Sequence, residues 1–172
     1  HDETIELITK IINTINKPIV LDADGLTCFS HLKGSLNNIV ITPHLGEFSK
    51  IINLRKSSII NDFIQIVADF LKSFDGVALI KHVPSCVARG NKLSFNSTGN
   101  PGLSTAGSGD VLSGVIASFI AQKMTKYDAC RLASFFHGKA ADNLINDKGI
   151  RGLIASDLPV EIARLIGEYE AN

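Results

Sequence analysis

The sequence of 172 residues has no tryptophan, only three cysteines and no excess of either sign of charge. Cys28, Cys86 and Cys130 lie far apart and form no CxxC pair. That spacing excludes a disulfide framework and a zinc-ribbon motif, and predicts reduced thiols in a cytoplasmic protein. Seventeen basic residues balance seventeen acidic ones, so nucleic acid and an anionic membrane are not expected as partners. No apolar run is long enough to cross a bilayer.

Helical and strand patterns alternate along the rest of the chain. Apolar residues at helical spacing predict helices over 4–15, from about His44 to 52, over 61–74, after Asp110, over 126–145, and from Ser156 or Asp157 through Leu165. Short apolar runs predict strands over 18–21, 39–41, 77–81, 85–89 and 92–96, the last two joined by a hairpin turn at Arg89–Asn91. The alternation predicts an α/β fold, a mostly parallel sheet flanked by helices, in a single domain over residues 1–172.

The stretch STGNPGLSTAGSGDVLSG, residues 97–114, combines five glycines with one carboxylate, Asp110, just where a helical pattern begins. A glycine loop that opens a helix, here Gly107-Ser108-Gly109, directs free N–H groups and the positive end of the helix dipole at an anion, most naturally a phosphate. Asp110 would then act as a base on a hydroxyl that attacks a phosphoryl group. The alternative is a simple turn followed by a favourable helix-start acid. No Lys-Ser/Thr pair follows, so the loop is not a Walker A motif.

Two further segments fall at the carboxyl ends of predicted strands, where open parallel sheets bind ligands. In TPHLGE, His44 could donate to a polar ligand and Glu47 could orient water on Mg²⁺, or both could be ordinary helix-start residues. In DADG, Asp22 and Asp24 could hold Mg²⁺, a ligand hydroxyl or a neighbouring loop, or could be capping residues. Lys81 ends a strand and could reach a phosphate, or could be solvated.

The strings PIVLDADGL, ITPHLGE, NSTGNPGLSTAGSGDVLSGVIA, HGKAAD and GLIASDLP occur in an order and spacing that resembles the ADP-dependent NAD(P)H-hydrate dehydratases of the ribokinase-like superfamily. The resemblance runs from about Lys17 to Leu165, and the GNPG…GSGDVL string is its most specific part. It implies a ribokinase-like fold and a repair reaction: hydrated NADH or NADPH loses water through phosphorylation of its ring hydroxyl by ADP, followed by loss of phosphate.

By motif position, the resemblance places His44 and Asp110 on the hydrated nucleotide. It places the adenine nucleotide on Lys81, His82, Val83, Pro84 and Ser85 and on the loop Gly107, Ser108 and Gly109, and it gives Glu47 a role in organising Mg²⁺. The implied partners are small molecules, ADP and hydrated NADH or NADPH, together with further copies of the chain and an epimerase, fused or separate.

Two departures from the family pattern leave other functions open. Lys81-His82 stands where the family has Lys-Gly, and the chain begins with His1 and carries none of the N-terminal strands of the family, so we expect an N-terminally incomplete domain. A ribokinase-like kinase acting on a small alcohol would need the same loop and base. A truncated chain that only binds nucleotide is the third hypothesis.

His137, on an apolar helix, is predicted to be a structural residue rather than a ligand.

Overall fold

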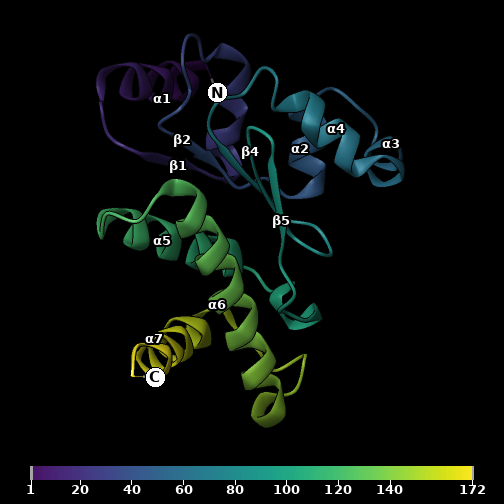
Figure 1. Ribbon diagram of the computed structural model, residues 1–172, viewed down its shortest axis with the longest axis vertical. Helices are drawn as coiled ribbons and strands as arrows, with labels where there is room; N and C mark the ends of the chain where they lie inside the picture. The colour runs from purple at the N-terminus through teal and green to yellow at the C-terminus, as the bar shows by residue number, and fades with distance from the viewer. Residues whose placement is uncertain (1, 172) are drawn as a thin grey trace. The chain divides into compact units, whose positions relative to one another are not determined.

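The computed structural model describes residues 2–171, which fall into two compact units, residues 2–95 (unit 1) and 96–171 (unit 2). Figure 1 shows the elements of both units. The single domain expected over residues 1–172 stays a prediction.

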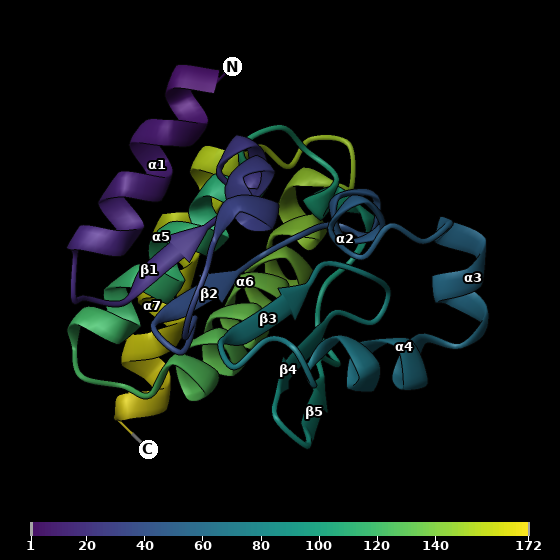
Figure 2. The ribbon, with the colours of Figure 1, turned by 90° about the horizontal axis from the view of Figure 1, so that it is seen from above.

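Unit 1 is built on a five-stranded sheet whose strands follow one another in chain order. The strands are β1 (Ile19–Leu21), β2 (Ile39–Ile41), β3 (Val77–Ile80), β4 (Cys86–Arg89) and β5 (Lys92–Phe95). The first three are parallel to one another, whereas β4 pairs antiparallel with both β3 and β5 (Figure 2). Arg89, the last residue of β4, faces Lys92, the first residue of β5, as the predicted hairpin requires. The α/β class is therefore confirmed.

The helices of unit 1 cover the sheet with apolar side chains. They are α1 (Asp2–Thr14), η1 (Ala23–His31, a 3-10 helix), α2 (Leu45–Ile51), α3 (Lys56–Asn61) and α4 (Phe63–Phe70). Phe48 of α2 and Phe70 of α4 are buried in one cluster with Ile41 and Ile80 of the sheet, and Ile8 of α1 packs against it. Burial of side chains of this size is the main stabilising term of such a layer. The sequence pattern did not predict η1, because a 3-10 helix lacks the 3.6-residue period.

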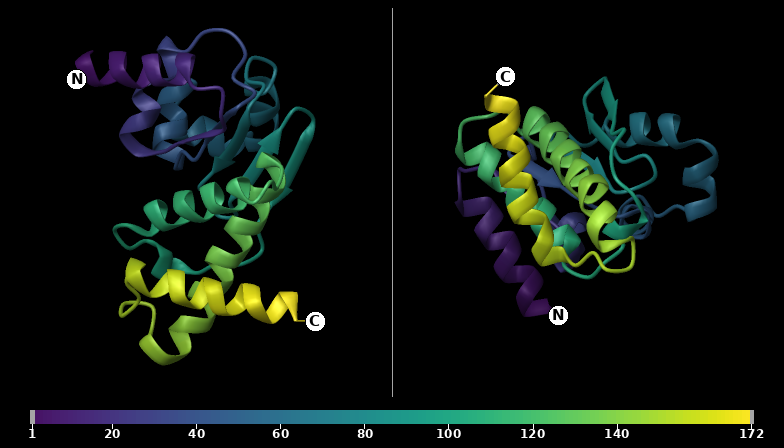
Figure 3. Two further views of the ribbon diagram at one scale, coloured as in Figure 1. Left: turned by 90° about the vertical axis from the view of Figure 1, so that its left-hand side faces the viewer. Right: turned by 90° about the horizontal axis from the view of Figure 1, so that it is seen from below.

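Unit 2 is helical. Its elements are η2 (Pro101–Leu103), α5 (Ser108–Ala121), α6 (Lys126–Lys148), η3 (Ala155–Asp157) and α7 (Leu158–Glu170). The long helix α6 packs against both α5 and α7, and Figure 3 shows α7 crossing it. Phe119 of α5, Phe136 of α6 and Tyr169 of α7 form a chain of ring contacts with centroids 6.4 and 5.5 Å apart. The predicted helices here are confirmed, and α7 extends beyond Leu165 to Glu170.

The three cysteines are free and buried. Burial raises the pKa of the Cys86 thiol to about 11 and that of Cys130 to about 12, so both stay protonated at neutral pH. In the described part of the chain, no helix is both long and apolar enough to span a membrane.

Candidate active site

In unit 1 the carboxyl ends of β1, β2 and β3 bring three of the predicted site segments together. Asp22 follows β1, His44 lies three residues beyond β2, and Lys81 follows β3. The Lys81 N–H donates to the Pro43 carbonyl at 2.7 Å, and His44 and Lys81 form a parallel bridge that prolongs the sheet. Parallel strand ends meet at one edge of a sheet, which is why residues so far apart in sequence are neighbours here.

Lys81 is paired with a carboxylate. Its Nζ lies 2.8 Å from Asp22 Oδ1, and the two side chains are 24% and 14% exposed. The same Asp22 oxygen also accepts from the Ala23 N–H at 2.9 Å, so this carboxylate caps η1 as well. A phosphate bound by Lys81 would therefore share the ammonium group with Asp22. Neither alternative considered for Lys81 from the sequence, a phosphate ligand or a solvated side chain, included this ion pair.

His44 and Glu47 together cap the N-terminus of α2. His44 Nδ1 accepts from the N–H groups of Gly46 and Glu47 at 2.9 and 3.0 Å, and Glu47 Oε2 accepts from the His44 N–H at 2.8 Å. This reciprocal pattern is a capping box. Because Nδ1 accepts, the proton of the neutral ring sits on Nε2, which lies 3.4 Å from Glu47 Oε1. The His44 side chain is 59% exposed, so its outer edge remains accessible to a ligand.

The segment after Lys81 is a turn held by its own side chains. The Val83 N–H donates to His82 Nδ1, and the Ser85 hydroxyl donates to the His82 carbonyl at 3.1 Å. The His82 ring packs edge-on against Phe63, with ring centroids 5.5 Å apart. Val83 is 90% exposed. His82 therefore anchors this turn to α4.

In unit 2, α5 begins without a side-chain cap. Gly107 precedes it with φ of +85°, a left-handed conformation that favours glycine, and a Cβ there would lie 3.2 Å from the Ala155 Cβ. Within residues 2–171, the N–H groups of Gly109 and Asp110 have no hydrogen-bond acceptor. The Asp110 carboxylate, in the first turn, is exposed and has no ionic partner in that part of the chain. Two free N–H groups at the positive end of a 14-residue helix are able to hold an anion.

Helix α6 holds the two ends of the glycine loop. At the first end, Thr98 Oγ1 donates to the Phe135 carbonyl at 2.8 Å. Asp142 accepts from the Gly99 N–H at 2.9 Å. At the second end, His137 Nε2 donates to the Ser108 carbonyl at 3.0 Å. The His137 side chain is buried, as expected of a structural residue, and its not being a ligand stays a prediction.

Sequence reasoning missed the part that α6 plays in the loop. The residues concerned recur at helical spacing, and they are Ser134, His137, Gly138, Ala141 and Asp142. This stripe of polar and small residues is a signal that could have been found, since four of its five members fall in the HGKAAD string. Its partner could not have been found, because the spacing within a helix does not say which loop packs on it.

The fit of Mg²⁺ rests on Glu47 in unit 1. The described residues contain no group of three or more metal-ligating side chains. Mg²⁺ is often held by one or two carboxylates together with substrate phosphates, so such a cage is not required. Glu47 is 20% exposed and keeps lone pairs beyond those used in the capping box, which fits a single water-mediated contact to the ion.

The fold of the chain is that of the ribokinase-like proteins. A solved ribokinase-like superfamily protein from Enterococcus faecalis superposes with a TM-score of 0.85 at 20% identity, over 98% of this chain and 60% of that one. An ADP/ATP-dependent NAD(P)H-hydrate dehydratase from Bacillus subtilis, co-crystallised with ATP and Mg²⁺, gives a TM-score of 0.85 at 22% identity, over 97% of this chain and 60% of that one.

Within that class, the chain belongs to the NAD(P)H-hydrate dehydratase family, whose profile matches residues 1–164. Among its relatives, the bifunctional NAD(P)H-hydrate repair enzyme of Moorella thermoacetica is 33% identical over 160 residues. That match covers 90% of this chain and 30% of the relative, so the chain spans about a third of the length of the curated protein it resembles.

Proposed function

We propose that the protein removes water from hydrated NADH or NADPH with ADP as the phosphoryl donor. The observation that carries the proposal is the open start of α5, where the N–H groups of Gly109 and Asp110 face no acceptor in the described residues and the Asp110 carboxylate is exposed beside them. Membership of the family supports the choice of substrate.

In this reaction the α5 start would bind the transferred phosphoryl group, and Asp110 would take the proton of the ring hydroxyl. The hydroxyl oxygen forms a bond to the β-phosphorus of ADP while the bond from that phosphorus to the bridging oxygen breaks, which releases AMP. The ring C–O bond then breaks with loss of phosphate, and a ring proton leaves to form the double bond of NADH. Fixed N–H dipoles stabilise the charge that gathers on the phosphoryl oxygens.

The residues of unit 1 would bind the two nucleotides. His44, with its proton on Nε2, would donate to the hydrated nucleotide, and the segment from Lys81 to Ser85 would contact the adenine nucleotide. Mg²⁺, when bound with the nucleotide, neutralises phosphate charge, and Glu47 is the residue that would orient it. Because Lys81 is already paired with Asp22, its ammonium group would offer the phosphates less net positive charge.

The test uses the intact protein with hydrated NADH, ADP and Mg²⁺, and follows the return of NADH absorbance together with AMP and phosphate by chromatography. Recovery of NADH with AMP and phosphate in equal amounts supports the proposal. No recovery from verified substrate overturns it. ATP-dependent phosphorylation of a thiazole, pyrimidine or sugar alcohol would instead assign a kinase that uses the same loop and base, and ADP binding without turnover would assign a nucleotide-binding protein.

We also propose that the protein works in the cytoplasm as a homo-oligomer alongside an epimerase. The curated relatives are named as bifunctional repair enzymes, which supports an epimerase on the same or a partner chain. Light scattering on the purified intact protein measures the oligomeric state, and a monomer at micromolar concentration would contradict that part.

A further inference from the structure

Asp142 uses both carboxylate oxygens on the GNPG part of the glycine loop. Oδ2 accepts from the Gly99 N–H and Oδ1 accepts from Asn100 Nδ2, each at 2.9 Å. Asn100 Oδ1 in turn accepts from the Gly102 N–H at 2.9 Å and caps the 3-10 turn η2. One acid on α6 thus orders the loop from Gly99 to Gly102, directly and through a single amide side chain.

The loop lies directly against α6 at this point. A Cβ on Gly138 would lie 2.3 Å from Thr98 Oγ1 and 2.6 Å from the Thr98 carbonyl carbon, so only glycine lets the backbone this close. Gly99, the next residue, has φ of +108°, which an L side chain rarely adopts. The close packing of the loop on Gly138 and the conformation of Gly99 therefore fix the direction of the Gly99 N–H toward Asp142.

The ordered loop is hydrogen-bonded in turn to the start of α5. Leu103, which ends η2, accepts from the Ser108 hydroxyl at 2.8 Å through its carbonyl, and Ser108 is the first residue of α5. The Ser108 carbonyl is held by His137 of α6. The path from Asp142 to the free N–H groups of Gly109 and Asp110 therefore consists of hydrogen bonds within unit 2.

We propose that Asp142 is a positioning residue for phosphate binding at the α5 start: it fixes the entry of the loop while His137 fixes the exit. The inference rests on the proposed function for the identity of the ligand, a nucleoside diphosphate. Asp142 touches no reacting atom. Its effect is to hold the backbone at Gly99–Leu103 in the conformation that keeps Ser108, and hence the next two N–H groups, in place.

Asn100 and Asp142 offer an exchange that tests this directly. In Asp142→Asn, an amide nitrogen meets the amide nitrogen of Asn100, and one hydrogen bond is lost. In Asn100→Asp, two carboxylates face each other. In the double variant, the amide now at position 142 accepts from the Gly99 N–H and donates to the carboxylate now at position 100. The other oxygen of that carboxylate still accepts from the Gly102 N–H, so all three hydrogen bonds return with the same total charge.

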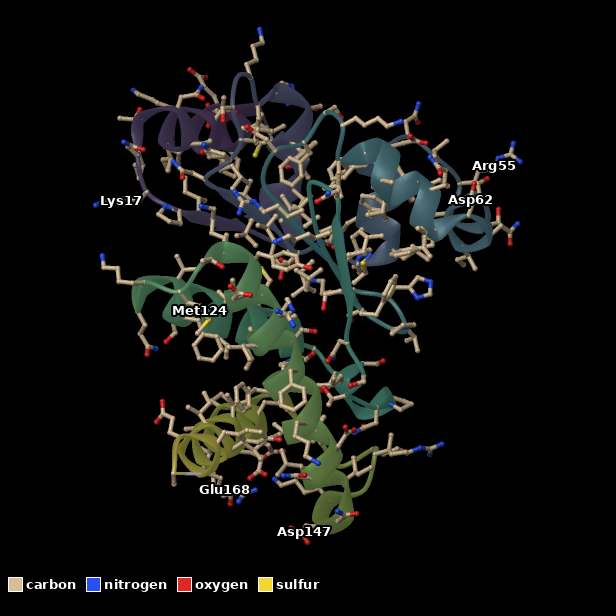
Figure 4. All side chains as sticks on the ribbon, viewed as in Figure 1. Lys17, Arg55, Asp62, Met124, Asp147 and Glu168 are labelled. Atoms are coloured by element: carbon tan, nitrogen blue, oxygen red, sulfur yellow. The ribbon has the colours of Figure 1, made fainter. Side chains whose placement is uncertain are left out.

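The experiment measures ADP and pyrophosphate affinity by calorimetry on the intact protein, at a temperature where thermal unfolding shows each variant fully folded. We expect Asp142→Asn to weaken ADP binding by about tenfold, Asn100→Asp to weaken it more, and the double variant to return to within about threefold of the wild type. Asp147→Asn is the matched control, since this exposed acid lies at the far end of α6 (Figure 4). The ADP affinity of this variant should equal that of the wild type.

Unchanged ADP affinity in a folded Asp142→Asn protein, with only its stability lowered, would show a purely structural role and overturn the proposal. The proposal would also be overturned if the double variant bound ADP as weakly as the single variants. A third contrary result would be NMR spectra of the wild type in which the Gly109 and Asp110 amide resonances do not shift on addition of ADP or pyrophosphate. If ADP binds and the exchange behaves as expected but hydrated NADH is not restored, the proposed reaction fails while the role of Asp142 stands.

Discussion

The two helix starts that the sequence marks as ligand sites, α2 and α5, differ in what occupies their N–H groups. At α2, His44 accepts from two of them and Glu47 returns a hydrogen bond to His44. At α5, Gly107 has no side chain to offer, and two N–H groups face no acceptor within the described residues. Both starts carry an acid in the first turn. A ligand must displace a cap at α2, whereas at α5 it displaces only solvent, so α5 is the natural anion site.

The largest effect should come from Asp110 in the open start. Asp110→Asn should lower turnover by about 10²–10⁴-fold, because it removes the base but leaves the free N–H groups. ADP affinity should be kept, since the carboxylate donates nothing to a phosphate. Single-turnover kinetics and calorimetry on the same preparations measure the two quantities, with Asp147→Asn as the charge-matched control. Turnover near that of the wild type would show that Asp110 is not the base.

The open start also depends on the conformation of Gly107. Gly107→Ala should lower the free energy of unfolding by about 1–2 kcal/mol and weaken ADP binding, because alanine disfavours a φ of +85° and its Cβ would crowd Ala155. Gly114→Ala, in the exposed middle of α5 with no atom within 4 Å of the new Cβ, should instead stabilise by about 0.5–1 kcal/mol. Urea denaturation compares them, and equal behaviour would refute the argument.

The closed start can be opened by removing its cap. His44→Ala should cost about 1 kcal/mol of stability, the usual worth of an N-cap, whereas His44→Asn should keep most of it because asparagine caps well. If His44 also donates to the hydrated nucleotide, both variants should raise the KM for that substrate alike. Denaturation together with steady-state kinetics separates the two roles, and an Asn variant with normal KM would leave His44 a cap only.

The smallest effect concerns a third helix start, that of α7. Asp157 precedes it, but its carboxylate accepts from the Ile154 N–H and from Lys148 Nζ rather than from α7 itself. The hydrogen bond from Lys148 holds the pKa of Asp157 below its usual range. The stability this contributes is present above the ordinary carboxyl pKa and is lost as pH falls through the lowered one.

Lys148→Met should therefore raise the pKa of Asp157 toward its ordinary value and cost a little stability at neutral pH. It should cost nothing once this carboxyl is protonated in both the folded and the unfolded protein. Titration of the Asp157 carboxyl carbon by NMR measures the pKa. An unchanged pKa would show that the backbone hydrogen bond alone sets it.

The sequence predicted the strands and the longer helices because their signals are local, and it missed the short elements η1 and α3. The strands at 39–41 and 92–95, the hairpin at Arg89, and the helix beginning after His44 all follow from apolar spacing and turn residues within a few positions. The glycine loop before α5 was likewise visible, since positive φ and a helix start demand particular residues in order.

The partners of the site residues were not visible for the opposite reason. Asp22 and Lys81 are 59 residues apart, and their ion pair exists only because β1 and β3 end at the same edge of the sheet. The sequence equally allowed Glu47 to be a metal-organising residue or a helix-start acid, and the structure shows the second use while the first stays a prediction.

The sequence by itself determined an alternating α/β chain with a glycine loop and an acid at one helix start, because backbone propensity and periodicity act over a few residues. Only the tertiary structure decided which helix start is open and what holds it. Asp142 reaches Gly99 across 43 residues, and His137 reaches Ser108 across 29. Those contacts depend on how α6 packs on the loop, and packing is a property of the whole unit rather than of any segment in it.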